Sequence, residues 1–558
     1  MTMPQIKTTN ITLATLTKSL ILFATTCLLL GCTGGESNVE QGNRDGILHY
    51  GNGTEPQGLD PHVVTGVPEN HLIRAMFEGL AVKNPYTLEP EPGVAESWEF
   101  SDDRRIITFH LREDALWSNG EVMTAQDYVW SWRRALDPKM GNLYAYMLYP
   151  VKNAEGYSKG EISDPDQLGV RAIDDRTLEV TLSEPTPYFL QLMDHYSTFA
   201  LHRETIEKFG KMTDRFTKWT RAENIVSNGA FELKEWKLNR RITVEKSQTY
   251  WDADKVKLNG VVFYPTENLV SEERMFRVGQ LHYTNDVPLS KLEVYRAMEN
   301  SPLVQAPYLG TYFYLLNTGR APVDDPRVRR ALSMAVDRET LTATVLKNAF
   351  FPAYGITPPG TLGYQPPKLF SHDVAKARAL LSDAGYPNGE GWPGLEIKYN
   401  TSENHRKIAV ALQQMWKEAL NIDVTIANEE WKVYLDSVTQ MNFQVSRRGW
   451  IGDYVDPNNF LELYTTDGGN NNTGFSDPRY DEMILQLAPK AKTREERFEI
   501  FHAAETLLME QMPIIPIYTY SSKHLIHPSV KGMPSNLMDS LNLKYVYLEP
   551  EATLETGL

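Results

Sequence analysis

The sequence predicts an α/β protein built from large lobes. Stretches rich in β-branched and aromatic residues alternate along the chain with stretches whose apolar residues keep helical spacing. The chain has 558 residues, and a body of that size can bury a large core. Its only cysteines are Cys27 and Cys32, both near the N-terminus, so packing rather than disulfide bonds must stabilise the body.

Clusters of β-branched and aromatic residues mark the expected strands, because such side chains fit a pleated, half-buried surface. They lie at 106–111, 178–182, 242–244, 261–264 and 311–316. Further strands are expected at 423–427 and 443–446, and 513–518 is expected to be extended.

Three helices carry the clearest signals. Asp325 and Pro326 open the first, since aspartate caps a helix and proline fits its first turn. Its apolar face would consist of Val328, Ala331, Leu332 and Ala335. A second helix follows Ser402 and a third covers 498–508, both with apolar residues at helical spacing. Helices alternating with strands in this way are typical of α/β lobes.

The N-terminal residues have the pattern of an export signal. Lys7 and Lys18 form a short basic lead, and an apolar run at 20–30 follows. The run is too short to span a bilayer as a helix but suits the core of a signal peptide. We therefore expect a signal peptide at 1–31, so that the rest of the chain works outside the cytoplasm.

Cys32 suggests how the chain is held there. A small residue, Gly31, directly before this cysteine resembles the bacterial lipobox. The resemblance implies that the Cys32 sulfur receives a diacylglyceryl group and that the protein is a periplasmic, membrane-anchored lipoprotein. A Gly/Ser/Asn-rich tether is expected at 32–45. The alternative is a simple secretory leader with an incidental cysteine.

The charge of the chain argues against two classes of partner. The formal net charge is −16, and losing Lys7 and Lys18 with the leader would make it −18. An acidic surface argues against binding nucleic acid or anionic lipid by electrostatics.

The sequence contains no metal-ligand cluster, no nucleophile elbow and no phosphate-binding loop. We therefore expect no metal, no cofactor and no catalytic residues.

A series of short motifs follows the chain in a fixed order. They are 58–62 (GLDPH), 77–80 (FEGL), 92–98 (PGVAESW), 109–112 (FHLR), 117–120 (WSNG), 125–129 (AQDYV), 227–230 (SNGA), 327–329 (RVR) and 449–454 (GWIGDY). Together they resemble the oligopeptide-binding proteins of ABC importers, over essentially the whole mature chain.

The resemblance implies a two-lobe periplasmic binding protein fold with a hinge and an extra domain on the first lobe. Lobe I would comprise 46–77, 203–305 and 522–558, the extra domain 78–202, and lobe II 306–521. It also implies a monomeric extracytoplasmic receptor that captures short peptides by their termini and backbone. The receptor would deliver them to an ABC permease and would do no covalent chemistry.

A free peptide presents an ammonium group, which needs a carboxylate when it is enclosed. Asp453 follows the strand expected at 443–446, and ligands bind at strand ends in α/β proteins. In the matching family motif this aspartate receives the amino terminus and Trp450 lines the site. Without the resemblance, Asp453 would be interpreted as a turn or helix cap.

The other end of a peptide is a carboxylate, which suits an arginine or a helix N-terminus. Arg447 matches the family's carboxylate-binding arginine, although a surface ion pair is an equal alternative and Arg448 could serve instead. His405, in the first turn of the helix after Ser402, matches a family histidine used by longer peptides. Its alternative is a solvated residue at a helix start.

The peptide backbone can pair with extended chain in both lobes. The resemblance assigns this to 64–67, with Thr65 and Val67, in lobe I, and to Gly449 and Ile451 in lobe II. Some family members have an acidic residue in place of Thr65, so a neutral threonine would weaken one contact. Tyr144 and Tyr520 align with cleft tyrosines, with a core aromatic as the alternative for each, and Asn285 matches a polar contact less securely.

Other functions stay open at this point. Within the binding class, the ligand could be a murein peptide, a nickel complex, haem or an oligosaccharide. A glycosidase would need two convergent carboxylates, and the sequence nominates only Asp453. A receptor that reports peptides without importing them is a third alternative.

Overall fold

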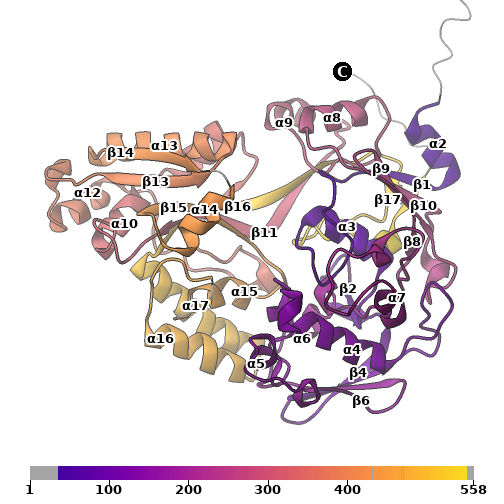
Figure 1. The fold of residues 1–558 in the computed structure, drawn as a ribbon. Helices are drawn as coiled ribbons and strands as arrows, with labels where there is room; N and C mark the ends of the chain where they lie inside the picture. Colours follow the sequence, from indigo (N-terminus) through magenta and orange to yellow (C-terminus); the bar gives the residue numbers. More distant parts are fainter. Residues whose placement is uncertain (1–35, 430, 467, 469, 550–558) are drawn as a thin grey trace, which may run out of the picture.

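The structure is a computed structural model that describes residues 36–429, 431–466, 468 and 470–549. The expected signal peptide and Cys32 lie outside the described residues. Strands of the described part form five sheets, arranged in two bodies that meet along one side (Figure 1). No helix among these residues is both long and apolar enough to cross a membrane.

The segments expected to form lobe I contain a four-stranded sheet in the order β1-β10-β9-β8, with β1 parallel to β10 and the other pairs antiparallel. The strands are β1 Ile47–Gly51, β8 Phe231–Lys237, β9 Arg241–Lys246 and β10 Gly260–Tyr264, with a small pair of β17 Val530–Lys531 and β18 Tyr547–Leu548. The helices are α2 Asn38–Asp45, α3 Val67–Met76, α7 Arg203–Lys208, α8 Leu269–Arg277 and α9 Leu289–Arg296.

The extra domain lies in the lower right of Figure 1, and in the sequence it comes between the first two segments of lobe I. Its antiparallel sheet has the order β4-β5-β7-β6, and β2 pairs separately with β3. The strands are β2 Ala81–Lys83, β3 Pro90–Pro92, β4 Ala95–Phe100, β5 Ile106–Leu111, β6 Val170–Ala172 and β7 Thr177–Thr181. Its helices are α4 Ala125–Leu136, α5 Ala154–Ser158 and α6 Phe189–Leu192, with a 3₁₀ turn η2 at Ala145–Leu148.

Lobe II, on the left of Figure 1, contains a six-stranded mixed sheet in the order β12-β16-β11-β15-β13-β14. The strands are β11 Leu303–Leu316, β12 Phe351–Pro352, β13 Leu395–Asn400, β14 Val424–Glu429, β15 Val445–Ile451 and β16 Ile514–Leu525. The helices are α10 Pro326–Met334, α11 Arg338–Thr340, α12 Val374–Asp383, α13 Glu403–Leu420, α14 Trp431–Thr439, α15 Asn458–Leu461, α16 Pro478–Asp481 and α17 Arg494–Gln511, and η10 is a 3₁₀ turn at Glu462–Tyr464. Trp416 of α13 is fully buried and donates to the carbonyl of Leu332 in α10, fixing the two helices together.

Two long antiparallel strands, β11 and β16, run from one body to the other (Figure 1). They pair from Leu303 and Leu525 to Leu315 and Ile514, but their register breaks between Pro307 and Thr311. The break lies beside the boundaries expected at 305/306 and 521/522. An interrupted strand pair can bend there, so a hinge at this point stays our prediction.

Most expected elements are confirmed, with boundaries shifted by a few residues. The segments 106–111 and 178–182 form β5 and β7, while 311–316 is the second half of a longer strand, β11. The cap signals were informative: the Asp325 side chain accepts from the Arg327 N–H at the start of α10, and Ser402 caps α13.

Two expectations need correction. Part of the expected tether is helical, because Ser37 and Glu40 form a capping box that starts α2 and Val39 of that helix is buried. The extended segment expected at 64–67 ends early, since Val67 is already the first residue of α3. Gly66 caps that helix, and Pro68 fits its first turn.

Candidate functional site

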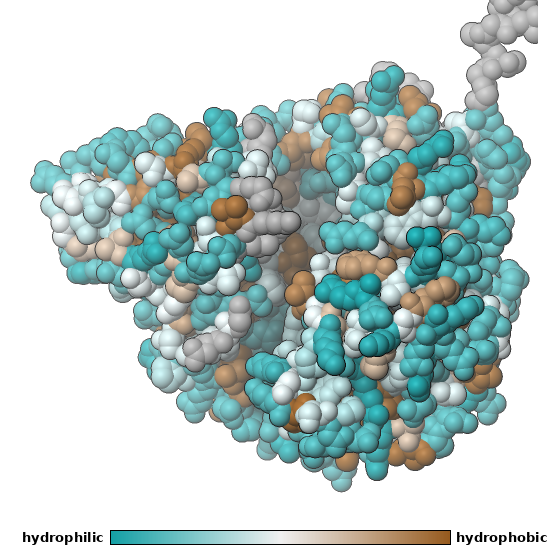
Figure 2. Space-filling view, in the orientation of Figure 1, coloured by the Kyte–Doolittle hydropathy of each residue, from teal (hydrophilic) through white to brown (hydrophobic). Residues whose placement is uncertain are grey.

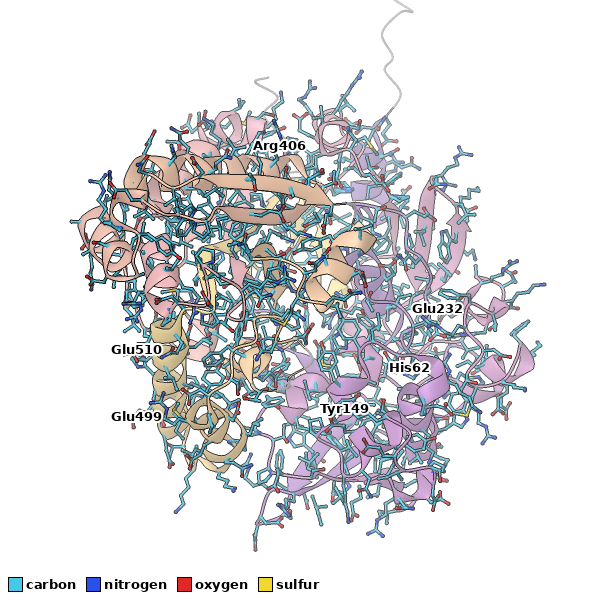
Figure 3. All side chains as sticks on the ribbon, turned by 60° about the vertical axis from the view of Figure 1, so that its left-hand side comes forward. His62, Tyr149, Glu232, Arg406, Glu499 and Glu510 are labelled. Atoms are coloured by element: carbon cyan, nitrogen blue, oxygen red, sulfur yellow. The ribbon has the colours of Figure 1, made fainter. Side chains whose placement is uncertain are left out.

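A cavity of about 1080 Å³ lies between the extra domain and lobe II and reaches lobe I at Thr65. The face drawn in Figure 2 is hollowed between its left and right parts. Five predicted residues line the cavity: Thr65, Tyr144, Trp450, Ile451 and Asp453. Tyr149, labelled in Figure 3, lines it from the side of the extra domain.

Asp453 lies just past the end of β15, where the chain leaves the lobe II sheet. Its Oδ2 accepts a hydrogen bond of 2.6 Å from the Tyr146 hydroxyl, and its backbone N–H donates to Oδ1 of Asn459. It forms no ion pair with any residue that the structure describes. Burial raises the pKa of Asp453 to about 6, and the hydrogen bonds from Tyr146 and Asn459 and the charge of Lys83 offset only part of this rise. A carboxylate in this state favours a cation from outside the protein.

Tyr146 is a residue that the sequence analysis missed. It lies in η2 of the extra domain, so its bond to Asp453 joins the extra domain to lobe II. Tyr144, two residues earlier, packs its ring 4.6 Å from His195 and lines the same cavity. The sequence could have pointed to Tyr146 through the close spacing of Tyr144, Tyr146 and Tyr149. No local pattern, however, shows which of these hydroxyls reaches lobe II.

Trp450 holds the Asp453 loop in place. Its indole Nε1 donates to Oδ1 of Asn459 at 2.9 Å, the same oxygen that accepts from the Asp453 backbone. Asn459 is fully buried, so this shared oxygen fixes both residues relative to α15. The arrangement fixes the backbone at Asp453, while the Tyr146 hydroxyl holds the carboxylate at the cavity wall.

Beyond Ser446, one edge of β15 has no strand partner among the described residues. The strand pairs with β11 as far as Ile451, but its pairing with β13 covers only Val445 and Ser446. The carbonyl of Arg447 accepts from the Tyr434 hydroxyl, so Arg447 faces the unpaired edge. Because strand residues alternate in direction, the backbone groups of Gly449 and Ile451 face the same edge. An extended ligand could add there as a further strand.

Gly449 leaves little room for a side chain without a shift of its neighbours. A Cβ at this position would lie 2.6 Å from the Tyr520 hydroxyl and 3.3 Å from Nη2 of Arg447. Across the cavity, the backbone N–H and C=O of Thr65 form no hydrogen bond with any described residue. Both segments therefore have main-chain groups available for a partner.

Arg447, His405 and Tyr520 form a second group of predicted residues, and none of the three lines the cavity. Nη2 of Arg447 donates to the Tyr520 hydroxyl at 3.1 Å, and its guanidinium lies 4.7 Å from the centre of the Tyr312 ring. Its Nε is buried and has no hydrogen-bond partner among the described residues. No described carboxylate pairs with Arg447, so its charge is available to an anion.

His405 joins this group through Tyr312, whose hydroxyl lies 3.3 Å from Nδ1 of the histidine. Burial, and then the charge of Arg447, lower the pKa of His405 to about 3. The ring is therefore neutral at physiological pH and can contribute a hydrogen bond but no charge.

Six predicted residues do not line the cavity: Gly449, Arg447, His405 and Tyr520, described above, and Val67 and Asn285. Val67 is 52% exposed on the first turn of α3. The backbone N–H of Asn285 donates to Oε1 of Glu272, and the Asn285 side chain lies against Gly53 in lobe I. The structure does not bring either residue together with Asp453.

The extra domain and lobe II also touch beyond Asp453. The rings of Tyr188 and Tyr454 stack with centroids 4.5 Å apart, and the backbone N–H of Val455 donates to the side chain of Gln191. Tyr454 packs into the core of the extra domain, although it belongs to lobe II. Tyr188 and Tyr454 also line the cavity.

Comparison with known proteins identifies relatives along nearly the whole chain. The sequence model described as "Bacterial extracellular solute-binding proteins, family 5 Middle" matches residues 89–472. The periplasmic oligopeptide-binding protein OppA of Salmonella typhimurium is 38% identical over 507 residues, covering 89% of this chain and 91% of OppA. The periplasmic murein peptide-binding protein MppA of Escherichia coli is 40% identical over 493 residues, covering 86% of this chain and 89% of MppA.

Solved structures agree with this result. The structure of the Escherichia coli murein tripeptide-binding protein MppA superposes with a TM-score of 0.78 at 39% identity, covering 90% of this chain and 98% of that one. Haemophilus influenzae OppA in complex with the peptide RPPGFSPFR gives a TM-score of 0.76 at 34% identity, covering 90% and 99%.

Proposed function

Because the chain belongs to the bacterial extracellular solute-binding proteins of family 5, we propose that it is an extracytoplasmic receptor for short peptides. Members of this family bind solutes and are not enzymes. The observation that carries the proposal is Asp453, a carboxylate without an ion-pair partner among the described residues, on the wall of a large cavity. The ammonium group of a peptide would supply the missing positive charge.

The peptide backbone would add to the unpaired edge of β15 in lobe II and meet Thr65 of lobe I from the other side. Main-chain hydrogen bonds of this kind are made by every peptide, whatever its sequence. Affinity would come from these bonds and the charged termini, and side chains could vary.

The carboxylate end of the peptide would bind Arg447, assisted by the Tyr520 hydroxyl and by neutral His405. Arg447 and Ile451 are four residues apart on β15, which corresponds to about 13 Å of extended chain. With its amino end at Asp453, a ligand running antiparallel to β15 would have roughly three to five residues.

Closure of the two lobes over the ligand would occur at the register break in β11 and β16. A peptide that touches Asp453 and Thr65 together interacts fully only with the closed form, so binding would shift the population toward closure. Binding of about −8 to −10 kcal/mol would leave the peptide extractable by a permease.

The receptor would act as a monomer, held at the membrane through lipid on Cys32, and would deliver peptides to an ABC permease. The signal-peptide pattern at 1–31 and the names of the relatives support an extracytoplasmic, periplasmic place of action. A murein peptide with a free amine is the second candidate, because MppA is as similar to this chain as OppA. Both ligand types share the ammonium group that Asp453 would bind.

A peptide mixture tests the proposal. The protein is incubated with di- to hexapeptides, their N-acetylated counterparts and a murein tripeptide, and bound compounds are identified by mass spectrometry after gel filtration. We expect intact peptides with free amino ends. Recovery of cleaved products, or of no peptide at all, would contradict the proposal.

Binding should weaken in mild acid. The ionised form of Asp453 is needed to hold an ammonium, and its pKa of about 6 in the free protein lies above the usual 3.8. The affinity should therefore be constant above about pH 7. Below pH 6 it should fall by up to about tenfold per pH unit, until the pH reaches the pKa of Asp453 in the complex, which the bound ammonium lowers. Calorimetry with tri-alanine from pH 4.5 to 8 measures this, and a flat profile down to pH 5 would contradict it.

Tyr146→Phe provides the matched variant for that titration. Removing the hydroxyl takes away a hydrogen bond to the ionised carboxylate, so the pKa of Asp453 rises further. The loss of affinity should then begin at a higher pH than in the wild type. An unchanged midpoint would mean that Tyr146 does not act on Asp453.

A further inference from the structure

The charges on the cavity wall do not balance. The charged side chains that line it are Glu155, Lys159, Glu184, Asp453, Glu462 and Arg497. Lys159 pairs with Glu155 at 2.6 Å, and Arg497 pairs with Asp456 at 2.5 Å. Glu184 pairs with Arg105 at 2.6 Å. Two carboxylates, Asp453 and Glu462, have no ion-pair partner among the described residues.

Glu462 is held in place by neutral groups only. The Tyr454 hydroxyl donates to its Oε1 at 3.0 Å, and Nδ2 of Asn458 donates to its Oε2 at 2.8 Å. These two bonds orient the carboxylate but supply no positive charge. Burial, with the nearby charges of Asp453 and Asp456, raises the pKa of Glu462 to about 7, although the Tyr454 bond acts in the opposite direction.

A buried glutamate need not be a binding group, as Glu505 of α17 illustrates. Its carboxylate accepts from the backbone of Ile356 and Thr357 and from the Tyr364 hydroxyl, it is fully buried, and it does not line the cavity. Glu505 thus fixes a loop to a helix. Glu462 differs because it lines the same cavity as Asp453.

We propose that Glu462 selects peptides whose first residue carries a cationic side chain. The inference rests on the proposed function, in which Asp453 takes the terminal ammonium and one uncompensated carboxylate remains. Asp453 and Glu462 line the same cavity and their charges act on each other. The first side chain leaves from the carbon that bears the ammonium, so with the ammonium at Asp453 it starts on the side of the cavity that carries both carboxylates. A lysine or arginine there completes the charge balance.

The walls near Glu462 also suit such a side chain. Tyr454 donates to Glu462 and stacks on Tyr188, and both rings line the cavity together with Leu463. Aromatic and apolar surfaces pack against the methylene stem of lysine or arginine, and a ring face attracts the cation itself. An acidic first side chain would instead face two carboxylates.

The test compares two peptides that differ in one charge, Lys-Ala-Ala and norleucine-Ala-Ala, by calorimetry at pH 7.5. In the wild type we expect the lysine peptide to bind at least tenfold more tightly. In Glu462→Gln the ratio should fall to within about twofold, while the affinity for the norleucine peptide stays nearly constant. Glu499→Gln, at an exposed position of α17 labelled in Figure 3, changes the net charge equally and should keep the full ratio.

The outcomes distinguish a failure of this inference from a failure of the proposed function. If both peptides bind the wild type equally well, the selectivity is refuted and the peptide receptor stands. If neither peptide binds, the proposed function fails and the inference fails with it. The comparison of the two peptides on the wild type tests the selectivity even if Glu462→Gln does not fold. If a folded Glu462→Gln keeps the wild-type ratio of the two affinities, another residue is responsible for the selectivity.

Discussion

Replacing Asp453 with alanine is expected to weaken tripeptide binding by about 2–5 kcal/mol, or roughly 30- to 4000-fold. The bound ammonium would be enclosed between the lobes without a compensating charge. No other described carboxylate except Glu462 is uncompensated on the cavity wall, so little replaces the lost interaction. Isothermal titration calorimetry with tri-alanine at pH 7.5 measures the change.

Asp102→Ala is the matched control, since it removes the same group from an exposed position of the extra domain. It should leave the affinity within about twofold of the wild type. Thermal unfolding of both variants checks that they are folded. Wild-type affinity in Asp453→Ala would show that the ammonium binds elsewhere.

The largest effect on stability is expected for Arg134→Met. Arg134 of α4 is fully buried, and its guanidinium forms two hydrogen bonds with the Asp60 carboxylate, at 2.6 and 3.0 Å. It also donates to the Met212 carbonyl and to Nδ1 of His62, a residue labelled in Figure 3. These bonds join three separate segments of the chain: the loop after β1, the extra domain, and the region after α7.

Without Arg134, the Asp60 carboxylate is left buried without its cation. We therefore expect a loss of about 3–5 kcal/mol in the free energy of unfolding, measured by urea denaturation at pH 7. Arg203→Met breaks an exposed pair with Glu207 and should cost no more than about 0.5 kcal/mol. A loss below 1 kcal/mol in Arg134→Met would contradict the account.

The pH dependence of this pair gives a second readout. Burial raises the pKa of Asp60, but the charge and hydrogen bonds of Arg134 together with the contributions of His62 outweigh burial and hold the pKa below its usual value of 3.8. A depressed carboxyl pKa contributes stability above the unfolded pKa, and the contribution is lost as pH falls through the folded pKa. The difference in the free energy of unfolding between the wild type and Arg134→Met should therefore become smaller below about pH 4.

Local chemistry made part of the fold predictable. The caps Asp325 and Ser402 act through bonds to residues two or three positions away, so the sequence alone locates the starts of α10 and α13. The capping box of Ser37 and Glu40 is equally local, yet the Gly/Ser/Asn-rich composition around it favoured a tether. Composition is the weaker signal where a specific capping pair is present.

The candidate site was predictable only where a motif identified its residues. Asp453, Trp450 and Arg447 lie in or beside one short motif, and their surroundings agree with the roles proposed for them. Tyr146 and Glu462 were missed, because Tyr146 matters through a contact across the cavity and Glu462 through its place on the cavity wall. Tyr146 meets Asp453 from 307 positions away, and no local spacing encodes such a contact.

The unpaired edge of β15 could not be predicted for a similar reason. Whether a strand keeps a neighbour depends on where the adjacent strand diverges, and β13 leaves β15 after Ser446. The motif around Gly449 and Ile451 pointed to the right segment, but only the sheet pairing explains why its backbone is available.

The most direct test of the central claim is a double cycle that combines ligand acetylation with Asp453→Ala. Tri-alanine and its N-acetylated form are titrated into both proteins at pH 7.5. If the ammonium binds Asp453, acetylation weakens binding to the wild type at least 30-fold but has little effect on the variant, because the two changes remove one interaction. Equal binding of the free and acetylated peptides to the wild type would contradict the account.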